Sequence, residues 1–399
     1  MKRIIIVSAV LLFLSVNMSI AQWEPDVRLT NSIANSNTRP SNCIAAVGNT
    51  VHIVWYDDRD GNRDIYYKQS TDGGINWGAD TRLTSNSSSS SYPSIAISGN
   101  NVHVVWQDNR DGNQEIYYKR SSDGGINWGA NTRLTNNTFS SETPSISVSG
   151  SNVHVVWVDN RDGNYEIYYK LSIDGGINWG TDIRLTNNTY SSLSPSIAVT
   201  VSLVYVVWYD ERDGNREIYY KRSADGGISW GAETRITYGI YASEFPVIGV
   251  SSTFVHVVWN DSRDGNSEIY YKRSTDGGIN WSADTRLTNN SAYSLYSSIS
   301  VSGSNVHIVW NDFRDGNFPY SGEIYYKHSV DNGLNWDIDT RLTNDSADSF
   351  YPSIAVSGTK VHVVWQDKRD GNDEIYFKRN PTGQVGIKNI STGIPTAFS

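Results

Sequence analysis

The sequence has one cysteine, Cys43, among its 399 residues, so a disulfide within the chain is excluded. It also has no basic run, and its formal net charge is −9. An acidic chain of this kind is a poor binder of nucleic acid, so we expect no nucleic-acid partner. Cys43 takes a position that other parts of the chain fill with Ser94 or Ser145. We therefore interpret it as a small core residue and not as a nucleophile.

Long hydrophobic runs are absent after the first 21 residues. The one apolar run, residues 4–16, follows the basic residues Lys2 and Arg3 and precedes a short stretch that ends at the small residue Ala21. This pattern is typical of a cleaved secretory signal and is too short to span a membrane comfortably. We expect a signal peptide over residues 1–21, a secreted or cell-surface protein (extracellular or periplasmic), and no transmembrane segment after signal removal.

A sustained helical period is also missing, and a long repeat stands in its place. A tryptophan ends seven short β-branched runs, at Trp55, Trp106, Trp157, Trp208, Trp259, Trp310 and Trp365. Five successive spacings are 51 residues and the last is 55. Within each unit, four short strand-like runs are separated by Gly, Asn, Asp and Ser, as residues 92–136 illustrate. The sequence therefore predicts seven all-β units of four strands.

The ends of the chain are offset from the repeat. Residues 23–30 match a fourth strand with no partners before it, and the seventh unit stops after its third strand. A closed ring uses both facts, because the first strand completes the last unit and no sheet edge is left at the junction. We predict an all-β, seven-bladed β-propeller over residues 22–379, closed by the N-terminal strand, and a flexible C-terminal linker or tail over residues 380–399. We expect a monomer.

A second repeated motif, Ser-x-Asp-Gly-Gly-x-x-Trp, follows the third strand and first occurs at residues 70–77. Its six copies carry Asp72, Asp123, Asp174, Asp225, Asp276 and Asp331. The motif resembles the Asp-box, or BNR repeat, of sialidase-like β-propellers, and only the sixth copy departs, with Asn332 for the first Gly. The resemblance implies that these turns lie at the outer rim, away from the central site. We interpret the aspartates as structural, since Asp can accept N–H bonds within its own turn and Gly permits positive φ.

A third motif, Asp-x-Arg-Asp-Gly-Asn, joins the second and third strands and is called the Arg loop here. Its arginines are Arg59, Arg110, Arg161, Arg212, Arg263, Arg314 and Arg369. Three interpretations remain open: a plain hairpin turn, a calcium loop, or a ligand site in which Arg binds carboxylate or sulfate. Asp58 of the first loop becomes Asn, Glu, Ser, Phe or Lys in others, so calcium is weakly supported and we expect no cofactor.

The linking loops, which join the fourth strand of one unit to the first strand of the next, vary most. They place an aromatic among polar residues at Tyr190, Tyr241 and Tyr293, a combination that suits sugar recognition and also ordinary loops. With the seven arginines, these tyrosines are the predicted ligand-binding residues. We expect them on the face that carries the central pocket in propellers.

The resemblance to sialidases raises the question of catalysis. That family uses one asymmetric set of three arginines, a tyrosine nucleophile with a glutamate, and an aspartate acid/base. This sequence repeats its arginines sevenfold, lacks the family's Arg-Ile-Pro motif, and offers no assignable tyrosine–glutamate pair. We therefore predict no catalytic residue and a secreted, non-catalytic propeller that binds glycans or another surface polymer through its Arg loops and linking loops. A sialidase-like exo-glycoside hydrolase is the alternative, and a structural surface module the third.

Overall fold

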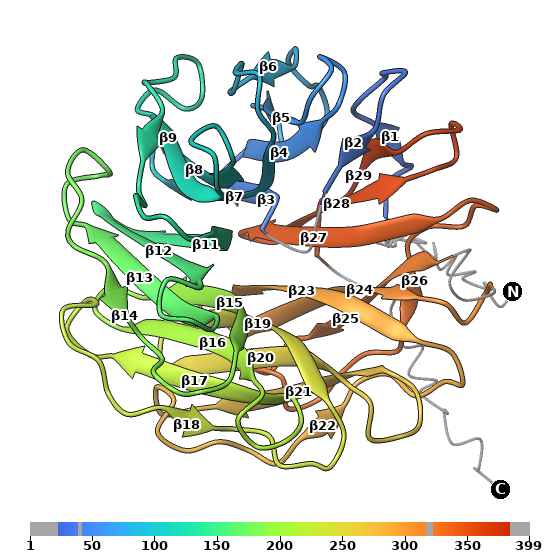
Figure 1. The fold of residues 1–399 in the computed structure, drawn as a ribbon. Helices are drawn as coiled ribbons and strands as arrows, with labels where there is room; N and C mark the ends of the chain where they lie inside the picture. The colour runs from blue at the N-terminus through green and yellow to red at the C-terminus, as the bar shows by residue number, and fades with distance from the viewer. Residues whose placement is uncertain (1–22, 39–41, 317–321, 384–399) are drawn as a thin grey trace, which may run out of the picture.

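The computed structural model describes residues 23–38, 42–316 and 322–383, and these form seven antiparallel sheets and no helix. The sheets are arranged radially about one axis, so the predicted seven-bladed propeller is confirmed (Figure 1). None of the described residues lies in a helix long and apolar enough to cross a membrane. The predicted signal peptide and nearly all of the predicted tail lie outside the described residues and stay predictions.

Each blade contributes strands in the same radial order. The innermost strands are β2 (Ser36–Asn37) with β3 (Ile44–Val47), β7 (Ser90–Ser98), β11 (Ser141–Ser149), β15 (Ser192–Val199), β19 (Ser243–Ser251), β23 (Ser294–Ser302) and β27 (Ser349–Ser357). The second strands are β4 (Thr50–Asp57), β8 (Asn101–Asp108), β12 (Asn152–Asp159), β16 (Val204–Asp210), β20 (Phe254–Asp261), β24 (Asn305–Asp312) and β28 (Lys360–Asp367). They are almost wholly buried, which explains their continuous apolar sequence.

The outer half of each blade consists of a longer third strand and a very short fourth. The third strands are β5 (Asp64–Ser70), β9 (Glu115–Ser121), β13 (Glu166–Ser172), β17 (Glu217–Ser223), β21 (Glu268–Ser274), β25 (Glu323–Ser329) and β29 (Glu374–Asn380). The fourth strands are β6 (Thr81–Arg82), β10 (Thr132–Arg133), β14 (Ile183–Arg184), β18 (Thr234–Arg235), β22 (Thr285–Arg286), β26 (Thr340–Arg341) and, in the last blade, β1 (Val27–Arg28). We number the blades 1 to 7 from β2 to β29.

The ring closes as the cut in the repeat predicts. Strand β1 pairs with β29 in blade 7, with Val27 opposite Phe377. Trp23 packs edge-on against Tyr326 of blade 6 at 5.0 Å, the contact that box tryptophans make elsewhere. Asn380, which the sequence assigned to the tail, is the fully buried last residue of β29.

The Asp-box turns are joints between neighbouring blades. In blade 2, Asp123 Oδ1 accepts the N–H of Asn127 at 2.9 Å and the hydroxyl of Ser121 at 2.7 Å. Trp128 packs edge-on against Tyr67 of blade 1 at 4.9 Å, and a side chain at Gly125 would collide with the Tyr67 hydroxyl. The box therefore fixes the turn and wedges one blade against the previous one. Asn332, the one departure among first glycines, has φ +57° and so keeps the left-handed turn that Asn tolerates.

A histidine of the second strand contacts the same tyrosine from the inner side of the blade. The Tyr67 hydroxyl lies 2.7 Å from Nδ1 of His52, and matching pairs occur at His103, His154, His256 and His307. Blade 7 is an exception, because Phe377 takes the tyrosine position and His362 has no hydrogen-bond partner among the described residues. These histidines are buried, packed residues, and burial lowers the pKa of His52 to about 4.

Candidate functional site

A β-bulge interrupts the inner strand of six blades at one position. The ladder between first and second strands shifts there, for example between Ser91 and Ser94 in blade 2. The bulge residue has positive φ in every case although none is glycine: Tyr92 (+54°), Thr143 (+48°), Ser194 (+54°), Phe245 (+51°), Tyr296 (+55°) and Tyr351 (+48°). Non-glycine residues rarely adopt this conformation, and such strain gathers at functional sites. We call these six residues the bulge ring.

The residue after the bulge explains how the strand tolerates it. A proline follows at Pro93, Pro144, Pro195, Pro246 and Pro352, and only blade 6 has Ser297 instead. Proline lacks an N–H and is accommodated on edge strands and at bulges. The inner strand is such an edge, since it borders the channel. Amides of the preceding blade hold two bulge residues in place: Gln107 Oε1 accepts the Thr143 N–H at 3.0 Å, and Asn311 Oδ1 accepts the Tyr351 N–H at 2.8 Å.

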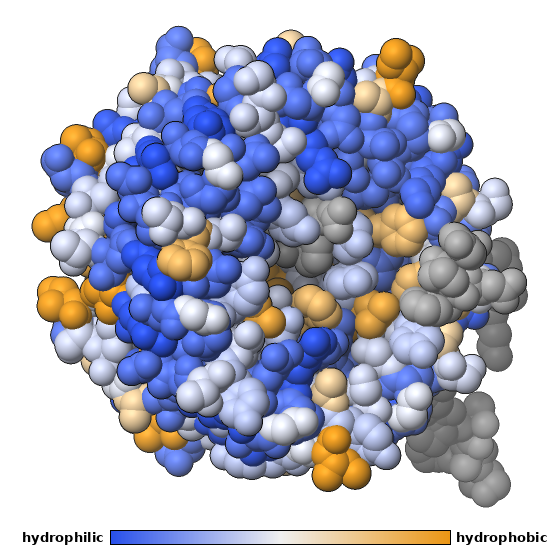
Figure 2. Space-filling model, viewed as in Figure 1, coloured by the Kyte–Doolittle hydropathy of each residue, from blue (hydrophilic) through white to orange (hydrophobic). Residues whose placement is uncertain are grey.

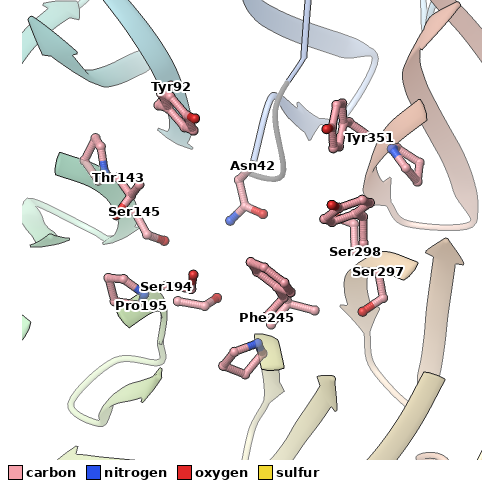
Figure 3. Close-up of a pocket in the computed structure, with 16 residues that line it drawn as sticks. Asn42, Tyr92, Thr143, Ser145, Ser194, Pro195, Phe245, Ser297, Ser298 and Tyr351 are labelled. Atoms are coloured by element: carbon pink, nitrogen blue, oxygen red, sulfur yellow. The ribbon is translucent and has the colours of Figure 1, made fainter. Parts of the chain in front are cut away.

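The bulge ring lines a pocket on the axis with a cavity volume of about 290 Å³. Figure 3 shows Tyr92, Phe245 and Tyr351 converging from different blades around the amide of Asn42. The same end of the axis appears as a hollow in a mainly hydrophilic face in Figure 2. Among the described lining residues there is no Asp, Glu, Arg, Lys or His. The pocket is therefore aromatic, hydroxyl-bearing and uncharged over its described surface.

The bulge ring has a high side, formed by large aromatic side chains, and a low side, formed by small side chains. Phe245 and Tyr296 lie 5.7 Å apart, and Tyr296 and Tyr351 lie 4.9 Å apart, so blades 5 to 7 present a continuous aromatic wall. Blades 3 and 4 instead place the small residues Thr143 and Ser194 at the ring. Aromatic faces stack on the apolar faces of sugars, while hydroxyl and amide groups bond to sugar hydroxyls. This sevenfold scaffold thus carries one asymmetric pocket.

The predicted linking-loop tyrosines are exposed and lie close in sequence to the bulge ring. Their exposed fractions are 54% for Tyr190, 50% for Tyr241 and 38% for Tyr293. Tyr190 and Tyr241 precede the bulge residues of their strands by four positions, so both lie on loops that lead directly into the pocket. Phe139 occupies the same position of another linking loop and is 49% exposed, although the predicted ligand-binding residues do not include it.

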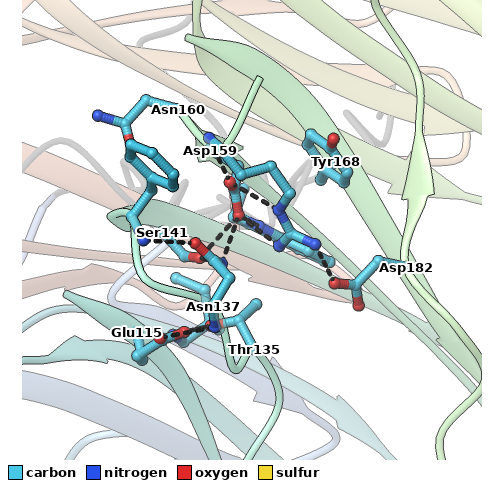
Figure 4. Close-up of polar contacts among 12 residues, drawn as sticks. Glu115, Thr135, Asn137, Ser141, Asp159, Asn160, Tyr168 and Asp182 are labelled. Carbon is cyan, nitrogen blue, oxygen red and sulfur yellow. Dashed lines mark hydrogen bonds and ion pairs between the residues drawn. The ribbon is translucent and has the colours of Figure 1, made fainter. Parts of the chain in front are cut away.

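The seven Arg-loop arginines lie outside the pocket lining and are engaged within their own blades. In blade 3, Asp159 accepts Nε of Arg161 at 2.8 Å and Nη2 at 2.6 Å, and Nη1 pairs with Asp182 at 2.8 Å (Figure 4). The guanidinium also lies over the ring of Tyr168 at 4.4 Å. Hydrogen bonds from Arg161, Trp157 and other neighbours hold the pKa of Asp159 low despite its burial. A ligand would therefore have to displace Asp159 to reach the whole fork.

The calcium interpretation rests on the alternating side chains Asp58, Asp60, Asn62 and Asp64 of the first Arg loop. Three of these side chains make contacts within the protein. Asp60 accepts the Tyr66 hydroxyl, and Asp64 pairs with Arg82 and Thr84. Asn62 donates its amide to the carbonyl of Ser88 at 2.7 Å. Within the described ranges, no group of three or more His, Cys, Asp or Glu is placed to hold a metal ion.

The bulge ring is the feature that sequence reasoning overlooked. Its signal is the residue before the repeated proline, which changes from Tyr to Thr, Ser and Phe while its surroundings repeat. Variation at one position of a repeat marks where seven blades stop being equivalent. The positive φ of the bulge residues could not be predicted from the sequence, because none of them is a glycine.

Comparison with known proteins places the chain in a family. Residues 58–308 match the BNR repeat-like domain. No curated protein matches the sequence significantly. Similar solved structures include a phage phi92 endosialidase (11% identity, TM-score 0.54, covering 94% of this chain and 71% of that one) and polysaccharide lyase Uly1 (9%, 0.61, 90% and 99%). Another is the GH93 α-L-arabinofuranosidase of Fusarium graminearum (14%, 0.52, 74% and 94%). At these identities the structures share the fold with this protein, and the family match shows that the chain belongs to the BNR repeat-like domain family.

Proposed function

We propose that this protein binds an uncharged part of a glycan in its central pocket without cleaving it. One observation carries the proposal: six strained, non-glycine bulge residues surround an aromatic pocket whose described lining is uncharged. Backbone strain persists only where its surroundings impose it, and it gathers at binding and catalytic sites. Few convergent polar groups on an otherwise aromatic and apolar lining suit a small ligand such as one sugar unit.

The exposed aromatics support a ligand longer than the pocket. Phe139 and Tyr190 lie four residues before Thr143 and Ser194, the small residues of the ring. A glycan chain that leaves the pocket over this low side would meet these two rings next. Stacking on them adds contacts without requiring charge. We therefore assign the first contacts to the bulge ring and the outer contacts to the linking loops.

In this proposal, the Arg-loop arginines contribute less to ligand binding than the sequence predicts. The guanidinium of each Arg-loop arginine except Arg110 donates to an acid just before the fourth strand as well as to the Arg-loop aspartate. A ligand gains little from a guanidinium that must first release a buried carboxylate. Similar folds in an endosialidase, an arabinofuranosidase and a polysaccharide lyase support a glycan as the ligand class. Secretion remains part of the proposal.

Glycoside hydrolysis is the second candidate, because one carboxyl group near the ring has a perturbed pKa. Burial raises the pKa of Glu142, the residue before Thr143, as a general acid requires. Its neighbour Tyr165 argues against the sialidase mechanism, since the Glu142 charge raises the pKa of that phenol. A nucleophilic phenol needs the opposite shift.

A glycan array with the chain lacking residues 1–21 tests the proposal. We expect retention on neutral oligosaccharides and no release of sugar during prolonged incubation. Product formation that is abolished in Glu142→Gln would make the protein a hydrolase. Failure to retain any glycan would leave the structural surface module as the remaining interpretation.

A further inference from the structure

Six blades share a bridging acid that blade 2 lacks. In each of the six, an Asp or Glu just before the fourth strand joins the Arg-loop arginine to a lysine of the third strand. The trios are Arg59–Asp80–Lys68, Arg161–Asp182–Lys170, Arg212–Glu233–Lys221, Arg263–Asp284–Lys272, Arg314–Asp339–Lys327 and Arg369–Asp26–Lys378. Blade 2 has Asn131 at the position of the acid.

Blade 3 shows the complete arrangement. Asp182 accepts Nη1 of Arg161 at 2.8 Å through one oxygen and Nζ of Lys170 at 2.9 Å through the other. Arg161 places its remaining donors on Asp159, so two cations face two carboxylates. The Asp182 side chain is only 20% exposed. The trio is therefore a largely buried and electrically balanced unit.

Blade 2 keeps both cations and loses that balance. Arg110 still binds Asp108 at 2.5 Å and lies over the Tyr117 ring at 4.2 Å, but its Nη1 has no hydrogen-bond partner among the described residues. Asn131 Oδ1 is buried and likewise unpaired within that part of the chain. Lys119 donates to the carbonyl of Leu83 at 2.7 Å and, of the residues described, pairs with no acid. One positive charge is thus uncompensated.

The uncompensated positive charge is half-buried, and this burial makes it destabilising. Burial and the Arg110 charge lower the pKa of Lys119. Burial also lowers the pKa of Lys221 in blade 4. Its acid, Glu233, lies 3.8 Å from Nζ, farther than the acids of the other trios, so Lys221 too is weakly compensated. A half-buried cation without a counter-charge is destabilising, so an external anion gains from taking the vacant role. The Arg110 side chain is 21% exposed and accessible to such an anion.

We propose that Arg110 and Lys119 form an oxyanion site at the junction of blades 1 and 2 that takes a carboxylate or sulfate group. Arg110 Nη1 supplies a directed donor and Lys119 a mobile point charge, a pairing that suits an oxyanion. The site is separate from the uncharged central pocket. Its ligand group is either carried on a sugar or free in solution.

Calorimetric titration with sodium acetate and sodium sulfate at constant ionic strength tests this site. The matched variants are Asn131→Asp, which completes blade 2, and Asp182→Asn, which opens blade 3. We expect one site in the wild type, at least tenfold weaker binding in Asn131→Asp, and a second site in Asp182→Asn. Asn131→Asp should also raise the melting temperature, since it restores the missing ion pairs.

A uronic-acid disaccharide identifies the source of the anion. Binding at least tenfold tighter than acetate, and lost in Asn131→Asp, supports a sugar-borne carboxylate, whereas affinity equal to acetate supports a free anion. Equal acetate and sulfate affinity in wild type and Asn131→Asp, or no binding in the wild type, would overturn the proposal. Neutral-glycan binding should be unchanged in both variants, which separates this test from that of the central pocket.

Discussion

The rim and the axis of this propeller use repetition in opposite ways. At the rim, each Asp-box turn presents nearly the same side chains to the neighbouring blade, as Trp128 and Trp179 do to Tyr67 and Tyr118. At the axis, the bulge position holds one backbone conformation but changes its side chain from Tyr to Thr, Ser and Phe. The comparison teaches that identical blades make the ring stable, whereas the departures between them create a site.

Removing the closing strand should break the rim most severely. Deletion of residues 23–30 exposes the edge of β29 and removes the Trp23–Tyr326 contact. Bare strand edges pair with other chains, so we expect aggregation. Size-exclusion chromatography with light scattering measures this, with the chain lacking residues 1–21 as control. A deleted protein that stays monomeric and melts like its control would show that closure is unimportant.

Acid should break the histidine joints next. Burial lowers the pKa of His52, His103 and His154 to about 4, whereas the unfolded value is near 6.5. Their contribution to stability is present above pH 6.5 and is lost as the pH falls toward 4, because the unfolded chain binds protons first. We expect a loss of about 2 kcal/mol per histidine at pH 5. Urea unfolding at pH 7, 6 and 5 checks this, and equal midpoints would contradict it.

The two glycines of one box sharpen the comparison. Gly124 and Gly125 both have positive φ, but only a side chain at Gly125 meets the Tyr67 ring. We expect Gly124→Ala to cost about 1–2 kcal/mol through backbone strain alone. Gly125→Ala should cost about 2–5 kcal/mol, since overpacking adds to the strain. Denaturant unfolding of both variants measures the difference, and equal losses would show that the box does not wedge the blades.

Blade 7 offers the smallest and most discriminating change. Phe377→Tyr should supply the hydroxyl that His362 lacks and stabilise the protein by about 0.5–1.5 kcal/mol. The reverse change in blade 2, Tyr118→Phe, removes the 2.7 Å contact with His103 and should destabilise by a similar amount. Thermal unfolding of both variants tests the pair. Changes of the same sign would show that this contact does not govern the joint.

The fold could be predicted because its signals are repeated and local. Seven tryptophans at constant spacing define the blades, and the unpaired fourth strand at residues 23–30 defines the closure. The pocket could not be derived in the same way. Tyr92 and Thr143 differ in type, and the bulge that turns both toward the axis depends on a register shift between strands, not on a local motif.

The arginines show a second limit of sequence reasoning. In the sequence, the acid adjacent to Arg161 is Asp162. The partners in the structure are Asp159, two residues earlier, and Asp182, which lies 21 residues later. Only the folded blade brings that second acid into place, so the exception at Asn131 has no meaning until the trios are seen.

Calorimetric titration of two variants with a neutral oligosaccharide retained on the array tests the central claim most directly. Phe245→Ser gives blade 5 the side chain that blade 4 has at Ser194, and Ile228→Ser changes an exposed box residue at the rim. We predict that Phe245→Ser weakens binding at least tenfold at a temperature where the variant is folded, because it removes part of the aromatic wall. Ile228→Ser should bind like the wild type. Unchanged binding in Phe245→Ser together with loss in Ile228→Ser would contradict the assignment of function to the axis.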